Sequence, residues 1–178
     1  YSSPYGIGSN GFNAPLGMAV DPTNGNLYVA DYGDNRILRF PSPFANPTRV
    51  EPDAVYGQPN FNSRGVNTGG TSAGSMSGPR AVAFDSSGNL WVADSNNARV
   101  LRFNAATLDS PNPQADIVIG QKDFASGLVN QGSGAVSASG FDIPAGLAFD
   151  QQGNLYVADF NNTRVLKFAF PVAMSASA

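Results

Sequence analysis

Any chemistry in this chain would depend on carboxylates, because the sequence contains no histidine and no cysteine. This composition removes the usual nitrogen and sulfur ligands of zinc, the histidine base of a serine nucleophile, and disulfides. The thirteen acidic residues are all aspartates except Glu51. A catalytic site or a calcium site would require several of these aspartates to converge on one cavity.

Three of the aspartates are each followed, five residues later, by an arginine in a polar turn. The pairs are Asp31 with Arg36, Asp94 with Arg99, and Asp159 with Arg164. Such pairs could form a polar binding ring, but a catalytic site normally breaks the symmetry of a repeat. We therefore expect each pair to brace a turn, with the aspartate accepting backbone N–H bonds. The sequence predicts no catalytic residue, no metal site and no cofactor.

The aspartates mark the ends of short strands in a sequence that is repeated three times. The copies occupy residues 15–40, 79–103 and 144–168, and the second and third share 16 of 25 positions. Each copy predicts three strands joined by turns rich in Gly and Asn, with a fourth strand at 53–57 and at 116–120. Asp21, Asp85 and Asp150 each precede the first turn, where they favour an Asx-type turn over a calcium loop. We expect an all-β fold of three four-stranded antiparallel blades.

The shared pattern P-x-G-[VLM]-A-[VF]-D, then G-N-L-[YW]-V-A-D, then R-[VI]-L-[RK]-F, resembles the NHL repeat in its longer-period bacterial form. This resemblance implies a β-propeller, which in the family is most often six-bladed. It implies no activity, because the family includes RNA-binding proteins, protein-binding platforms and a few enzymes. We expect one propeller segment over residues 1–178, with blades at about 12–58, 76–121 and 141–170.

The two ends of the sequence predict an unusual way of completing the fold, because three blades are too few to close a ring. The third copy has no fourth-strand motif after Phe168, whereas residues 1–11 contain a segment similar to one. This segment could add as an exchanged strand to the third blade of another copy, giving a two-copy ring or a head-to-tail filament. The residues of the expected contact are Tyr5, Gly6, Ile7, Gly8, Val165, Leu166 and Phe168. The alternative is that the chain is a fragment of a larger six-bladed propeller.

Two long loops are the candidate ligand-binding segments. Each begins with the pattern G-Q-x-x-F-x-S and continues through Gly, Ser and Asn, over 58–78 and 121–140. Loops of this length are usually functional or mobile. The candidate contacts for a glycan or a partner protein are Gln58, Phe61, Arg64, Gln121 and Phe124. Because Phe61 and Phe124 occur at the same place in both loops, the pattern favours anchors that pin each loop onto its blade over ligand contacts at these two positions.

The overall charge narrows the function classes further. The formal net charge is −3 with only ten Lys and Arg residues, which argues against binding nucleic acid. No segment has the apolar length that membrane insertion requires. The Ser-, Gly- and Asn-rich composition with little Lys favours an extracellular or cell-surface location. We expect a non-catalytic scaffold or interaction module that associates with copies of itself; the alternatives are a platform for a glycan or another surface protein, and part of a propeller lyase or lactonase.

Overall fold

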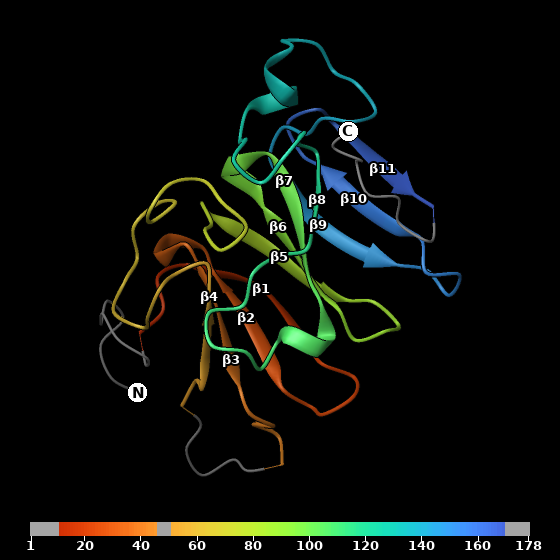
Figure 1. The fold of residues 1–178 in the computed structure, drawn as a ribbon. Helices are drawn as coiled ribbons and strands as arrows, with labels where there is room; N and C mark the ends of the chain where they lie inside the picture. The colour runs from red at the N-terminus through yellow and green to blue at the C-terminus, as the bar shows by residue number, and fades with distance from the viewer. Residues whose placement is uncertain (1–10, 46–50, 170–178) are drawn as a thin grey trace.

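The computed structural model describes residues 11–45 and 51–169, and these form three antiparallel β-sheets set side by side (Figure 1). The first sheet contains β1 (Pro15–Val20), β2 (Leu27–Asp31), β3 (Arg36–Phe40) and β4 (Ala54–Tyr56). The second contains β5 (Pro79–Phe84), β6 (Leu90–Asp94), β7 (Arg99–Phe103) and β8 (Ile117–Ile119). The third contains β9 (Pro144–Phe149), β10 (Leu155–Asp159) and β11 (Arg164–Phe168). The predicted all-β architecture of propeller blades is confirmed.

Helical structure in the described residues is limited to short 3-10 turns, and none of them could cross a lipid bilayer. η1 (Tyr32–Asp34) and η2 (Ser95–Asn97) join the second and third strands of their sheets. η3 (Ala105–Thr107) follows β7, and η4 (Val129–Gly132) lies in the second long loop.

The first hairpin of each sheet is closed by the aspartate that ends its first strand. In the second sheet, Asp85 Oδ1 accepts hydrogen bonds from the backbone N–H groups of Ser87 and Asn89, at 2.9 and 3.0 Å. Asp150 repeats these contacts in the third sheet with Gln152 and Asn154. These carboxylates therefore satisfy the backbone of their own turns, as an Asx-type turn requires.

The sheets pack face to face through two apolar clusters. One cluster joins the first and second sheets, and there the ring of Tyr28 meets Phe84 edge-on at 5.0 Å between centroids. The other joins the second and third sheets, where Trp91 meets Phe149 at 5.7 Å. The same repeat positions thus make both interfaces, and the first strands of the sheets, β1, β5 and β9, contact one another in chain order (Figure 1).

The close approach of β1 to β5 makes a glycine necessary at one position. A Cβ atom on Gly17 would lie 2.5 Å from the carbonyl oxygen of Arg80 and 2.8 Å from Cα of Ala81. Both are backbone atoms, so the two sheets would have to move apart. We expect Gly17→Ala to lower the free energy of unfolding by about 1–3 kcal/mol, measured by urea denaturation.

The same repeat position in the third sheet supplies the control. A Cβ atom on Gly146 would have one close neighbour, the Cβ atom of Ala158 at 3.3 Å. We expect Gly146→Ala to change the free energy of unfolding by less than about 1 kcal/mol. Equal losses in the two variants would show that strand propensity, and not the contact between sheets, sets the cost.

Candidate functional site

The repeated aspartate–arginine pairs lie inside the sheets and hold backbone, as the second pair shows most fully. Arg99 Nε donates to Asp94 Oδ2 at 2.7 Å, and both side chains are 0 % exposed. The remaining guanidinium nitrogens donate to three carbonyl oxygens, of Phe124 at 2.6 Å, Ser75 at 2.9 Å and Ser72 at 3.0 Å. Burial raises the pKa of Asp94, while Arg99 and other donors oppose this shift.

The other two pairs repeat this arrangement. Arg36 donates to Asp31 at 2.8 Å and to the carbonyl oxygens of Phe61 and Gly11, at 2.6 and 2.8 Å. Arg164 donates to Asp159 at 2.8 Å and to two carbonyl oxygens of the second long loop. Each arginine therefore ties long-loop or linker backbone to the turn between the second and third strands. The arrangement can position loops, but it offers no charged group to a ligand at its centre.

The two glutamines that open the long loops are also buried in backbone contacts. Gln58 Nε2 donates to the carbonyl oxygens of Asn35 and Gly65, at 3.0 and 2.7 Å. Gln121 Nε2 donates in the same way to Ala98 and Leu128, at 2.9 and 2.8 Å. Both side chains are buried beneath the loops, where they hold loop backbone, and each also lines one of two cavities beside the loops.

Each long loop also fastens onto the sheet that follows it, through a pair of asparagine amides. Asn67 and Asn97 exchange two hydrogen bonds, at 2.9 and 2.8 Å. Asn130 and Asn162 repeat the exchange at 3.4 and 2.9 Å. Asn67 and Asn130 both have positive φ, 46° and 48°, a conformation that asparagine tolerates better than most residues. Sequence analysis did not identify these pairs; their only signal was an asparagine at a similar distance before each following repeat.

The other predicted ligand contacts of the two long loops, Phe61, Phe124 and Arg64, differ in burial and in what they contact. Phe124 packs against the cluster between the first and second sheets. Phe61 is half-buried and lines a cavity, with its backbone held by Arg36. The side chain of Arg64 is exposed, and its carbonyl oxygen accepts a hydrogen bond from Asn35 at 3.0 Å.

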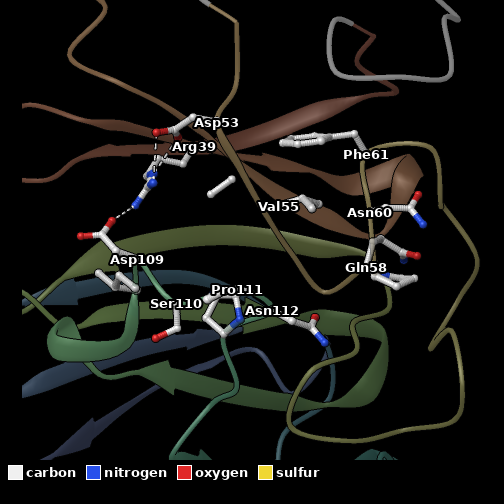
Figure 2. A pocket seen from close by; sticks show the side chains of 14 residues that line it. Arg39, Asp53, Val55, Gln58, Asn60, Phe61, Asp109, Ser110, Pro111 and Asn112 are labelled. Atoms are coloured by element: carbon white, nitrogen blue, oxygen red, sulfur yellow. Dashed lines mark hydrogen bonds and ion pairs between the residues drawn. The ribbon is translucent and has the colours of Figure 1, made fainter.

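The cavity beside Phe61 has a volume of about 360 Å³ and lies between β4 and the segment 108–113 (Figure 2). At one end Arg39 donates to both oxygens of Asp53, at 2.7 and 3.0 Å, and to Asp109 across the gap between the sheets. Burial would lower the pKa of Arg39, but its bonds to the two carboxylates outweigh this and raise it. At the other end lie Phe61 and Asn60.

A second cavity, of about 510 Å³, opens between the two long loops. Its lining is mostly neutral and polar, with Lys122 as the charged member. Nowhere in the described residues do three His, Cys, Asp or Glu side chains gather as a metal site would require. What these cavities can do chemically is donate and accept hydrogen bonds, and the first can also attract a cation.

The residues predicted to mediate self-association separate into two groups in the structure. Leu166 and Phe168 pack against the cluster between the second and third sheets, so they face inward. Val165 faces the opposite side of β11 and is 64 % exposed. The predicted exchanged segment of Tyr5, Gly6, Ile7 and Gly8 lies outside the described residues.

Comparisons with known proteins agree with this architecture. The family model of the NHL repeat matches residues 12–40, 76–103 and 141–168, one match in each sheet. Among curated proteins, SUPPRESSOR OF QUENCHING 1, a chloroplast protein of Arabidopsis thaliana, is 24 % identical over 154 residues, which cover 86 % of this chain and 14 % of that protein.

Two solved structures share the fold with low sequence identity. A Bacteroides caccae protein of unknown function superposes with a TM-score of 0.56 at 12 % identity, covering 90 % of this chain and 48 % of that one. A chain of a nidogen–laminin complex gives 0.56 at 20 % identity, covering 94 % and 46 %. This chain therefore spans less than half the length of the proteins it matches. With its three matched repeats in three propeller-like sheets, the chain belongs to the NHL-repeat family of β-propeller proteins.

Proposed function

We propose that the chain is a non-catalytic interaction module that associates with copies of itself through its two end sheets. The observation that carries this proposal is the difference between equivalent positions inside the array and at its ends. Ile37 and Val100, on the third strands of the first and second sheets, are fully buried by the sheet that follows. Val165 is the equivalent residue of the third sheet, and it is 64 % exposed.

The rest of this open face has the same character as the two covered ones. Tyr156 occupies the position of Tyr28 and Trp91, both of which are buried against a phenylalanine of the next sheet. On the third sheet Tyr156 is only half-buried. The open face therefore presents apolar and aromatic groups at the positions where a following sheet packs inside the array.

The first sheet presents the complementary surface at the other end of the array. Met18 and Val20 of β1 are 70 % and 45 % exposed. The equivalent residues of the second sheet, Val82 and Phe84, pack against the first sheet. A second copy can therefore place its first sheet on the third sheet of the first copy. Such a head-to-tail contact closes into a ring of two copies or continues as a filament.

A substitution at Val165 tests this contact. We expect the unchanged chain to form a dimer or longer assemblies, measured by light scattering during size-exclusion chromatography. Val165→Asp places a charge in the apolar contact and is expected to give a monomer that keeps its fold, because the side chain is already exposed. Val66, also 64 % exposed but in the first long loop, supplies the control: Val66→Asp should leave the assembly unchanged. An unchanged chain that runs as a monomer contradicts the proposal.

Strand exchange by the N-terminal segment is a separate part of this proposal. Sheet order in the described residues ends at β11, which leaves an edge strand that an added strand could pair with. Removal of residues 1–10 should then abolish association. If this shorter chain still assembles while Val165→Asp does not, the contact consists of sheet packing without strand exchange.

The Ser-, Gly- and Asn-rich composition and low lysine content support an extracellular or cell-surface location for the module.

A second candidate function is a platform for another molecule, and one observation favours it. The described residues contain cavities of about 360 and 510 Å³ beside the two long loops. Binding there would not depend on Val165, because that residue lines neither cavity.

A further inference from the structure

The cavity between the first two sheets lies along the outer edge of a β-strand. Asp53, Ala54 and Val55 form one side of it, and the segment 108–113 of the second sheet forms the other (Figure 2). The strand β4 is the last in the order β1-β2-β3-β4, and it pairs on its inner side with β3. In the described part of the chain no further strand pairs with its outer side. An edge strand beside open space is a template for another extended chain.

The opposite side of the cavity does not supply the pairing that β4 lacks. It includes Pro111 and Pro113, which have no backbone N–H to donate. The fourth strand of the second sheet makes a useful comparison, because Ile117, Val118 and Ile119 are all buried. Ala54 and Val55 are half-buried, so β4 is the more accessible of the two edges.

The charges at one end of the cavity favour a cationic partner. Arg39 is shared between Asp53 and Asp109, so the three side chains together carry one negative charge. The guanidinium is largely buried, whereas the side chains of Asp53 and Asp109 are 42 % and 89 % exposed. A molecule entering the cavity therefore meets carboxylates first. The other end offers the ring of Phe61 and the amide of Asn60, which are neutral.

We propose that this cavity binds an extended peptide segment, which adds a strand to the outer edge of β4 and places a lysine or arginine beside Asp109. Main-chain hydrogen bonds to β4 would supply the affinity, and this part of the binding depends little on the sequence of the peptide. The carboxylates select the charge of the segment. The contact is small, so we expect weak binding of the kind found in transient interactions.

The direct test uses three labelled hexapeptides and fluorescence anisotropy at low salt. The first, Lys-Val-Thr-Val-Thr-Lys, carries a cation at both ends, so that either strand direction brings one to Asp109. The second has the same sequence with alternate backbone amides methylated, which blocks strand pairing and keeps the charge. The third replaces both lysines with glutamates. We expect the first peptide to bind at least about tenfold more tightly than either of the others.

A charge-reversal variant shows where the peptide binds. Asp109→Lys should weaken the lysine peptide by about tenfold and strengthen the glutamate peptide, because the exposed side chain at the cavity mouth changes sign. Arg39 keeps Asp53 as its partner in this variant, so the fold should be retained, checked by circular dichroism. Asp142→Lys, in the bend that precedes β9 and away from the cavity, is the control and should leave both affinities unchanged.

Three results would each overturn the peptide site. The first is no binding of the lysine peptide up to about 1 mM. The second is that the methylated peptide binds as tightly as the unmethylated lysine peptide. The third is that the Asp109→Lys variant binds the lysine and glutamate peptides with the same affinities as the unchanged chain. The result is separable from self-association, because Val165 does not line this cavity. The monomeric Val165→Asp variant should therefore bind the lysine peptide as the unchanged chain does.

Discussion

Arg99→Ala is expected to lower the free energy of unfolding by about 3–5 kcal/mol, the largest effect of any single substitution considered for this protein. The variant leaves the carboxylate of Asp94 buried without its cation, at a position that is 0 % exposed. It also removes the donors to the carbonyl oxygens of Phe124, Ser72 and Ser75. The loss is measured by urea denaturation followed by circular dichroism.

Arg164→Ala is the matched comparison, because Arg164 occupies the same repeat position in the third sheet. Its side chain is 22 % exposed, so water can replace part of what the arginine donates to Asp159 and to the loop. We expect a loss of about 1–2 kcal/mol. If the two variants lose the same free energy, burial is not what makes the second pair more important.

Gly120→Ala is expected to cost about 3 kcal/mol, from a strained backbone and a steric overlap together. Gly120 has a φ of +91°, which a residue with a side chain rarely adopts. A Cβ atom there would lie 2.2 Å from Cδ2 of Phe141 and 2.9 Å from the carbonyl oxygen of Ala98. Phe141 is fully buried in the cluster between the second and third sheets, so its ring has little room to move.

Gly69→Ala separates the two causes. Gly69 has a similar φ of +84°, but a Cβ atom on it would meet nothing within 4 Å. This variant should lose only the backbone part, about 1 kcal/mol. The difference between the two glycine variants, again from urea denaturation, then measures the packing around Phe141. Equal losses would mean that the ring of Phe141 moves aside at little cost.

The strands could be predicted from the sequence because their signals are local. Each strand is a short apolar run between turn residues, and threefold repetition averages out the ambiguity of any single copy. The fourth strands, predicted at 53–57 and 116–120, are present as β4 and β8. The third sheet has three strands in the described residues, and residues 170–178, which lack a fourth-strand motif, lie outside them.

The candidate sites were harder to predict, because sequence does not distinguish a buried polar side chain from an exposed one. Gln58 was predicted as a ligand contact in a polar loop; its side chain is buried and bonded to two carbonyl oxygens, and it also lines the cavity beside Phe61. Arg39 gave no signal beyond its place in a strand. Its importance comes from Asp109, which is seventy residues away in sequence and reaches it only after the sheets have packed.

The asparagine pairs also relate to the order in which the chain is synthesised. Each long loop holds the sheet that follows it, through Asn67 on Asn97 and Asn130 on Asn162. A ribosome makes Asn67 before Asn97 and Asn130 before Asn162, so each fastening residue leaves the exit tunnel ahead of the sheet it will hold. Nascent sheets therefore emerge next to a partner already synthesised, which suits growth from the N-terminus and shortens the time that an unpaired strand spends exposed to other chains.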